Sequence, residues 1–231
     1  SVTAASYPAL AQMVEDREVE VGIFSPAAYV TARRNMNGVA IATATRLGSP
    51  TYLGYLVVLK PDVEPGDAPD PPPLIEDMAG KRVAWVNKSS TSGYHYPRAM
   101  LRSKGIDPDD FFGEQIFALD HEKAATMVIE GRADVAAVAS AFADPGTATT
   151  VPGANRLLAI AKTSRIPLDC VVVHTRRQRA LAMKLRAALL DLNTHEAGER
   201  LVTSWGVDGF VKPLHERYND IEEILEGRDV G

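Results

Sequence analysis

Residues Val83–Leu101 read VAWVNKSSTSGYHYPRAML, and this stretch decides the fold that we expect for the whole chain. It begins with a short apolar run of strand length, continues through four hydroxyl residues, and then carries a helical pattern from Tyr94 to Lys104. Gly93 allows the backbone to approach another group closely. Free N–H groups, the helix dipole and nearby hydroxyls together form a favourable anion site. The alternative is an ordinary serine N-cap, and this turn alone leaves both interpretations open.

The overall composition limits the classes of partner. At 231 residues the chain is long enough for one domain or two lobes with a substantial core. A net charge of −5 gives no electrostatic reason to expect nucleic acid or an anionic membrane, so a bound anion must be held by local donors. The single cysteine, Cys170, excludes an internal disulfide and paired-cysteine zinc motifs. No stretch reaches the roughly 20 apolar residues of a membrane-spanning helix, so membrane insertion is not expected.

Apolar runs of strand length alternate with helical patterns along the chain. Strands are predicted over 20–24, 39–45, 51–60, 81–87, 111–119, 133–140, 156–162 and 171–174. Helices are predicted over 7–16, 26–34, 75–80, 94–104, 124–130, 179–192, 196–202 and 220–225, with a proline-rich loop over 61–73. This alternation favours an α/β fold with mostly parallel sheets, in which ligands bind at the carboxyl ends of strands. The polar clusters at 25–26, 89–94, 120–121 and 140 all follow predicted strands.

The residues offer little catalytic chemistry. No nucleophile with a base, no paired acid and base and no metal-binding cluster stands out, so we expect no catalytic residue, metal or cofactor. His121 differs from the other histidines because Asp120 and His121 lie where a strand gives way to a helix; the alternative is a capping or surface histidine. Tyr7 and Tyr52 offer phenols next to turns or side chains for the core. Asp169 could bind a cation or serve a turn.

Several of these segments resemble the substrate-binding proteins of phosphonate and phosphite ABC importers. The strongest match is GKRVAWVNKSSTSGY at Gly80–Tyr94, followed by PRAML at 97–101 and GIDP at 105–108. Further matching segments lie at 7–10, 19–29, 121–125, 128–138 and 164–169. The resemblance therefore spans nearly the whole chain.

The resemblance implies a two-lobed periplasmic-binding-protein fold, in which the ligand closes between the lobes at a hinge of two crossing strands. Each lobe would hold a mostly parallel sheet flanked by helices. The first lobe would comprise residues 1–59 and 168–231, and the second lobe residues 60–167. Family members begin with a strand and a helix ahead of the tyrosine that corresponds to Tyr7, so we expect the first lobe of this sequence to lack its opening βα unit.

The resemblance also assigns ligand-binding roles to seven residues: Tyr7, Tyr52, Ser90, Thr91, Ser92, His121 and Asp169. The three consecutive hydroxyls would hold phosphoryl oxygens, and the histidine would add a donor from the same lobe. The two tyrosines would face them from the first lobe, and the aspartate would receive a ligand ammonium group. Hydroxyl and N–H donors hold an oxyanion without a fixed positive charge, which permits release.

The leading hypothesis is a solute-binding protein that captures a small phosphorus oxyanion or organophosphonate for an ABC importer. Its partners would be the small anion and the transporter permease, and it would work in the periplasm or at the outer face of a membrane. Two alternatives remain at this stage. One is a ligand-sensing regulatory domain of the same fold; the other is an enzyme on this fold, which the lack of a nucleophile–base pair disfavours.

Overall fold

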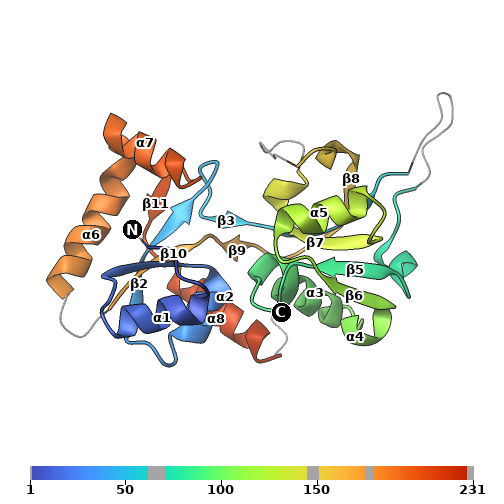
Figure 1. Cartoon of the computed structure of the whole chain (residues 1–231), viewed down its shortest axis with the longest axis horizontal. Coiled ribbons are helices and arrows are strands. Elements are labelled where there is room, and N and C mark those ends of the chain that lie inside the picture. Colours follow the sequence, from blue (N-terminus) through green and yellow to red (C-terminus); the bar gives the residue numbers. More distant parts are fainter. Residues whose placement is uncertain (1, 62–70, 145–150, 175–178, 228–231) are drawn as a thin grey trace. The chain divides into compact units, whose positions relative to one another are not determined.

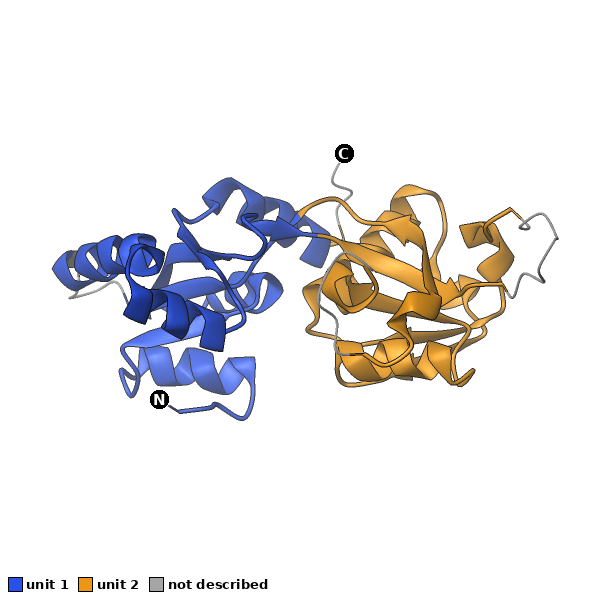
Figure 2. Cartoon of the chain, turned by 90° about the horizontal axis from the view of Figure 1, so that it is seen from above, with its two compact units in different colours: residues 1–52, 166–226 blue, residues 53–165, 227–231 orange. Residues whose placement is uncertain are grey.

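The structure is a computed structural model that describes residues 2–61, 71–144, 151–174 and 179–227 (Figure 1). The chain divides into two compact units (Figure 2). Unit 1 comprises residues 1–52 and 166–226, and unit 2 comprises residues 53–165 and 227–231. The unit boundaries fall after residues 52 and 165, whereas the lobe boundaries expected from the sequence lie after residues 59 and 167.

Unit 2 is built on a five-stranded sheet in the order β6-β5-β7-β4-β8. The strands are β4 (Gly54–Leu59), β5 (Arg82–Trp85), β6 (Glu114–Phe117), β7 (Val135–Ala139) and β8 (Leu157–Lys162). β5 pairs in parallel with both β6 and β7, while β4 runs antiparallel to β7 and β8. The carboxyl ends of β5, β6 and β7 therefore share one edge of the sheet.

Helices cover both faces of this sheet. They are α3 (Tyr96–Ser103), α4 (Pro108–Phe111) and α5 (His121–Ile129), with a π-helix at Thr91–His95 and 3-10 turns at Ile75–Met78, Ser140–Phe142 and Ala154–Arg156. Along β4, Val57 packs into the core on the α5 side, while Leu56 packs into the core around Trp85 and Leu101. Both faces of the strand are buried, which explains why β4 reads as a continuous apolar run.

Unit 1 holds a four-stranded sheet in the order β1-β10-β2-β11 and a short two-stranded ribbon. The sheet strands are β1 (Val21–Phe24), β2 (Gly38–Thr45), β10 (Cys170–His174) and β11 (Gly209–Val211), and the ribbon joins β3 (Thr51–Tyr52) to β9 (Ile166–Pro167). The helices are α1 (Tyr7–Glu15), α2 (Pro26–Ala32), α6 (Arg179–Asp191), α7 (Glu196–Ser204) and α8 (His215–Leu225), with a 3-10 turn at Leu192–Thr194. The Tyr218 ring is buried against Tyr29, and its hydroxyl lies 2.9 Å from Thr43 Oγ1.

The α/β class is confirmed, but the expectation of mostly parallel sheets is wrong. Every neighbouring pair described in the sheet of unit 1 is antiparallel, because β10 enters between β1 and β2 in the opposite direction. The sheet of unit 2 is mixed, because β4 lies between β7 and β8 and runs in the opposite direction to both. Among the described strands, only β5, β6 and β7 have the parallel arrangement that the alternating pattern predicts.

Three predicted elements are corrected. The strand expected over 51–60 is split at Leu53, because Tyr52 pairs with Ile166 whereas Gly54 pairs with Ala139. The strand expected from 111 begins only at 114, because Pro108–Phe111 forms a short helix that the Asp107 side chain caps. The helix expected from 124 begins at 121, because the carboxylate of Asp120 accepts the Lys123 N–H at 2.7 Å.

Two further expectations concern the loop and the membrane. Residues 62–70 of the predicted proline-rich loop lie outside the described residues. Within the part of the chain that the structure describes, no helix is both long enough and apolar enough to cross a membrane.

Candidate functional site

The polar segments of unit 2 meet at the carboxyl ends of its three parallel strands. The hydroxyl turn follows β5, His121 follows β6, and Ser140 follows β7. The Leu119 N–H donates to the Val86 carbonyl at 2.8 Å, which joins the first two segments. The Ala139 N–H donates to Nδ1 of His121 at 3.1 Å, which joins the last two. Sheet topology thus collects residues that are up to 50 positions apart in the sequence.

The turn after β5 is held by an ordinary N-cap. Ser90 Oγ accepts the Gly93 N–H at 3.0 Å, and the Ser90 carbonyl accepts the His95 N–H at 3.1 Å in the π-helix. A Cβ atom at Gly93 would lie 2.4 Å from Cγ2 of Val86, so only glycine fits here without displacing the strand. The capping interpretation is therefore correct for Ser90, and the close approach expected of Gly93 is present.

Ser92 differs from Ser90 because its hydroxyl has no structural use in the described protein. Thr91 and Ser92 are 3% and 1% exposed. Ser92 Oγ is buried and lacks a hydrogen-bond partner among the described residues. A buried hydroxyl without a partner costs about 1–3 kcal/mol. An acceptor oxygen that reached this hydroxyl would recover that free energy, which is the behaviour expected of a ligand-binding group.

His121 is held as a neutral donor. Its Nδ1 accepts a backbone N–H, so the proton of the neutral ring lies on Nε2. Burial lowers the pKa of His121 to about 4, although Asp120 partly opposes the change. The ring also stacks on Phe142 with the centroids 5.2 Å apart. The hydrogen bond from Ala139 and the stacking on Phe142 orient the ring. The Nε2–H makes no hydrogen bond to the described residues, so it can donate to another group.

Unit 1 offers phenols and a carboxylate in place of a donor cluster. The Tyr7 ring stacks on Phe24 with a centroid separation of 6.1 Å. Burial and the nearby Asp169 raise the pKa of the Tyr7 hydroxyl, and interaction with Ser25 partly offsets this. Ser25 Oγ is buried and has no hydrogen bond of normal geometry within the described ranges. Tyr7, Ser25 and Asp169 therefore form one electrostatically connected group.

Asp169 is exposed to solvent. Its side chain reaches solvent, yet the surrounding protein raises the pKa of Asp169 to about 6, with a smaller opposing effect from Arg46. The Asp169 carbonyl accepts the Ala44 N–H at 2.9 Å, which fixes the backbone. Tyr52 is half-buried and packs on the apolar core of unit 1. Packing on the core thus explains the position of the Tyr52 ring, and the contact of Tyr52 with a ligand stays a prediction.

Sequence reasoning missed two residues of the unit 2 cluster. Phe142 orients His121, and no local pattern marks an aromatic residue in a 3-10 turn for that task. Asn87 contacts both the hydroxyl turn and the segment before His121. Its position between a strand and a serine run is a turn signal that could have indicated it.

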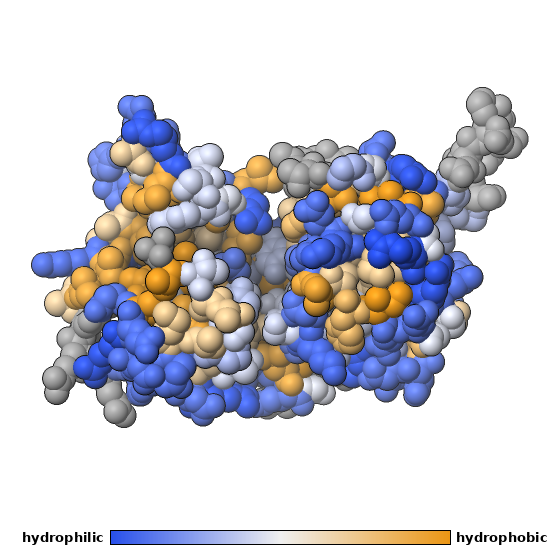
Figure 3. All heavy atoms as spheres, in the orientation of Figure 1, coloured by the Kyte–Doolittle hydropathy of each residue, from blue (hydrophilic) through white to orange (hydrophobic). Residues whose placement is uncertain are grey.

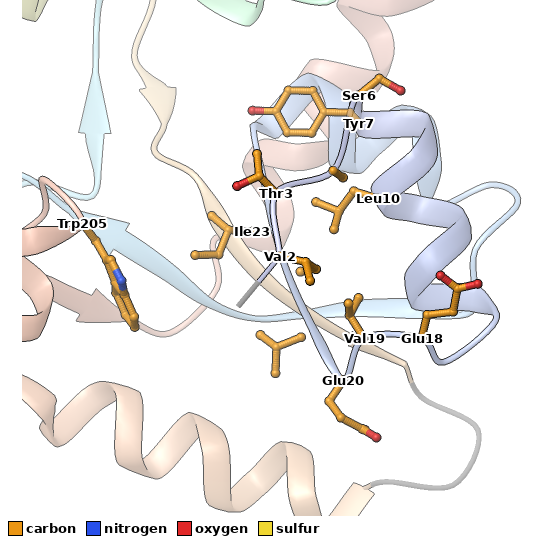
Figure 4. Close-up of a pocket in the computed structure, with 13 residues that line it drawn as sticks. Val2, Thr3, Ser6, Tyr7, Leu10, Glu18, Val19, Glu20, Ile23 and Trp205 are labelled. Atoms are coloured by element: carbon orange, nitrogen blue, oxygen red, sulfur yellow. The ribbon is translucent and has the colours of Figure 1, made fainter.

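A groove in unit 1 does not suit an oxyanion. It has a volume of about 890 Å³ and is lined by Val2, Thr3, Ala4, Ser6, Tyr7, Leu10, Glu18, Val19, Glu20, Val21, Gly22, Ile23 and Trp205 (Figure 4). These lining residues include two glutamates and neither lysine nor arginine, so the local charge opposes an anion. Hydrophobic side chains also gather on the visible face of unit 1 (Figure 3). Among the residues that line the groove, Ile23 and Trp205 are nearly half exposed. The donor cluster of unit 2 is the better anion site.

The described residues contain no cluster of three or more histidine, cysteine, aspartate or glutamate side chains that could hold a metal ion. The donors at 90–92 and 121 are hydroxyls and an imidazole N–H. These groups can donate hydrogen bonds to an anionic oxygen.

Comparison with known proteins gives consistent matches. The sequence model of a family described as "ABC transporter, phosphonate, periplasmic substrate-binding protein" matches residues 1–218. The phosphate-import protein PhnD of Mycolicibacterium smegmatis is 29% identical over 143 residues, which cover 58% of this chain and 42% of that protein. The match thus spans less than half the length of this curated relative.

Two solved structures share the fold at low identity. A Xanthomonas citri protein bound to ATP superimposes with a TM-score of 0.80 at 18% identity, covering 98% of this chain and 84% of its own. PhnD1 from Prochlorococcus marinus, in complex with methylphosphonate, gives a TM-score of 0.77 at 18% identity with the same coverage. At this level of identity the likeness establishes the fold.

Proposed function

Since this chain belongs to the family of periplasmic substrate-binding proteins of phosphonate ABC transporters, we propose that it captures a small phosphorus oxyanion or organophosphonate for an importer. The observation that carries the proposal is the donor cluster of unit 2. There, a buried Ser92 hydroxyl without a hydrogen-bond partner among the described residues and the Nε2–H of His121 belong to adjoining strand ends. The names of the matched relatives, a phosphate-import protein and a methylphosphonate complex, support this ligand class.

The chemistry of the cluster favours reversible binding of an anion. A phosphoryl group presents several acceptor oxygens, and the cluster offers hydroxyls, a neutral imidazole and the N–H groups of a helix start. Hydrogen bonds to an ionised acceptor are stronger than neutral ones. Because these donors carry no fixed charge, the ligand can leave without separating an ion pair.

The proposal assigns a second set of contacts to unit 1. Tyr7, Tyr52 and Asp169 would contact the same ligand molecule, and Asp169 would receive an ammonium group where the ligand carries one. The exposure of Asp169 to solvent supports this role. The two units would act as the two lobes of the binding protein. The loaded protein would deliver its ligand to a permease, in the periplasm or at the outer face of a membrane, without chemical turnover.

A ligand panel tests the proposal directly. The melting temperature is measured with methylphosphonate, phosphite, 2-aminoethylphosphonate, phosphate and sulfate at several concentrations. A ligand present at 100 times its Kd stabilises the native state by about 2.7 kcal/mol, which gives a clear shift. We expect a phosphorus oxyanion to raise the melting temperature of the wild type more than that of Ser92→Ala. A panel without any shift would contradict the proposal, and ³¹P NMR of the bound ligand over hours would reveal turnover.

A further inference from the structure

We propose that Asn87 is a positioning residue that couples the hydroxyl turn to His121, so that the two groups of donors keep one relative geometry. The inference rests on the proposed function insofar as its readout is phosphonate affinity. Asn87 is half-buried two residues after the end of β5 and makes hydrogen bonds through both ends of its side-chain amide. It would act on the ligand through the segments that it joins.

One end of the amide organises the hydroxyl turn. Oδ1 of Asn87 accepts the Ser89 N–H at 3.0 Å and the Ser89 hydroxyl at 2.7 Å. The main-chain carbonyl of Asn87 accepts the Ser90 N–H at 3.0 Å. These bonds lead directly into the Ser90 cap and the buried hydroxyls after it. An ordinary asparagine turn would explain this half of the geometry.

The other end reaches the second segment. Nδ2 of Asn87 donates to the carbonyl of Leu119 at 3.2 Å, and a local turn does not explain a bond over 32 positions. The two contacts fix the orientation of the amide, because a carbonyl oxygen needs a donor and an N–H needs an acceptor. Asn87 is therefore a bridge, since reversal of the amide would break both contacts.

Leu119 shows why a bridge is needed there. Its φ of 79° lies in the left-handed region, which is unfavourable for any residue with a Cβ atom. Its side chain is 69% exposed, so burial of the leucine does not maintain this conformation. The hydrogen bonds that hold its backbone are Leu119 N–H to the Val86 carbonyl and Asn87 Nδ2 to the Leu119 carbonyl. An unfavourable backbone maintained at the edge of a site indicates a functional constraint.

The constrained turn determines where His121 starts. Asp120 follows Leu119 and caps α5, and His121 is the first residue of that helix. The ring is then held by the Ala139 N–H and by Phe142. A change at Leu119 would therefore move the backbone of His121, while the contacts with Ala139 and Phe142 hold its ring in place. The direction of the Nε2–H would change as a result.

The test compares Asn87→Asp with Ser89→Ala. Aspartate keeps an acceptor for Ser89 but replaces the donor to the Leu119 carbonyl with an oxygen, whereas Ser89→Ala removes one hydroxyl of the same turn and leaves the bridge intact. Calorimetric titration with methylphosphonate should give a Kd at least about tenfold higher for Asn87→Asp and within about twofold of wild type for Ser89→Ala. Asn87→Asp loses one hydrogen bond and also places a negative charge near the anion, and the repulsion from that charge should persist when Leu119 is replaced by glycine.

A double variant separates positioning from simple damage. Leu119→Gly lets the backbone adopt the same left-handed conformation without steric strain, so the effect of Asn87→Asp should be smaller in the Leu119→Gly background than in the wild type. Additive effects, or equal effects of Asn87→Asp and Ser89→Ala, would overturn the inference.

A readout without ligand keeps this inference distinct from the proposed function. ¹⁵N NMR of the imidazoles should show the His121 resonances displaced in Asn87→Asp and unchanged in Ser89→Ala. If the wild type bound none of the phosphorus oxyanions while this displacement occurred, the proposed function would fail and the bridge would stand. If the wild type bound methylphosphonate and neither the Kd nor the His121 resonances changed, the bridge would fail and the proposed function would stand.

Discussion

Units 1 and 2 differ in the topology of their sheets and in the polar groups that they bring together. Unit 2 gathers neutral donors from 90–92 and 121 at the ends of parallel strands that are close in the sheet. Unit 1 has an antiparallel sheet and brings phenols and a carboxylate from segments as far apart as Tyr7 and Asp169. Under the proposed function, the donor set would bind the phosphoryl group that all these ligands share, and the carboxylate would contact the organic group, which differs between ligands. The comparison predicts that changes in unit 2 affect all ligands and changes in unit 1 affect selected ones.

The largest expected effect comes from closing the space at Gly93. Gly93→Val places atoms where Val86 already lies, so we expect a loss of about 2–3 kcal/mol in the free energy of unfolding. The hydroxyl turn would move, and affinity should fall about 100-fold for every ligand, equivalent to about 2.7 kcal/mol. Urea unfolding and calorimetric titration measure the two effects.

A matched control distinguishes crowding from backbone strain. Gly48 has a φ of 70°, but no atom lies within 4 Å of the position that a Cβ would take, so Gly48→Ala strains unit 1 without crowding it. It should cost about 1 kcal/mol of stability and leave the affinity unchanged. Equal losses of affinity in the two variants would remove the distinction between the units.

Two neighbouring serines should respond in opposite ways. Ser92→Ala removes a buried hydroxyl without a partner among the described residues, so stability should stay constant or rise, while affinity falls about 10- to 30-fold through the loss of a donor to an anion. Ser90→Ala removes the N-cap hydroxyl that accepts the Gly93 N–H and should cost about 1 kcal/mol of stability. Thermal unfolding with and without methylphosphonate checks both. A stability loss in Ser92→Ala as large as that in Ser90→Ala would refute the ligand-directed role of Ser92.

Asp169→Asn tests the selective role of unit 1. Affinity for 2-aminoethylphosphonate should fall about tenfold, and affinity for methylphosphonate should change less than about threefold, because only the first carries an ammonium group. The pKa of Asp169 is raised to about 6, so the fold favours the protonated carboxyl. That contribution to stability is complete below the ordinary pKa of 3.8 and is lost as pH rises through 6. The amide introduced by Asp169→Asn cannot titrate, so this pH dependence should disappear in the variant. Equal losses of affinity for both ligands would contradict selectivity.

The smallest effect is the pH dependence caused by His121. Its pKa of about 4 lies below the ordinary 6.5, mainly through burial, so the unfolded chain takes up a proton that the folded protein excludes. The stabilising contribution of neutral His121 is therefore complete above pH 6.5 and is lost as pH falls toward 4. His121→Gln should reduce the loss of stability between pH 7 and pH 5 by about 1 kcal/mol after allowance for solvent screening.

Urea unfolding at both pH values measures this effect. His95 has a pKa that burial also lowers to about 4, so acid sensitivity should be reduced in His121→Gln without disappearing. An unchanged pH dependence would show that His121 does not exclude the proton, and the neutral-donor assignment would be wrong.

Much of unit 2 could be predicted from the sequence because its signals are local. The hydroxyl run, Gly93 and the apolar strand before them lie within a dozen residues, and each acts on its neighbours through capping or close approach. The expectation that His121 follows a strand end also needed only local pattern. The antiparallel sheet of unit 1 could not be predicted in this way, because the insertion of β10 between β1 and β2 is a long-range event.

The sequence by itself determined the α/β class, the family and the identity of the donors at 90–92 and 121, because hydrophobic period, turn chemistry and motif are properties of short segments. Only the tertiary structure decided which hydroxyl caps the helix and which has no hydrogen-bond partner among the described residues. Ser90 and Ser92 look equivalent in the sequence. In the structure, however, Ser90 caps the helix through the Gly93 N–H, and the Ser92 hydroxyl is buried without a partner among the described residues. Hydrogen-bond partners and desolvation depend on atoms brought from distant segments, so they exist only after the chain has folded.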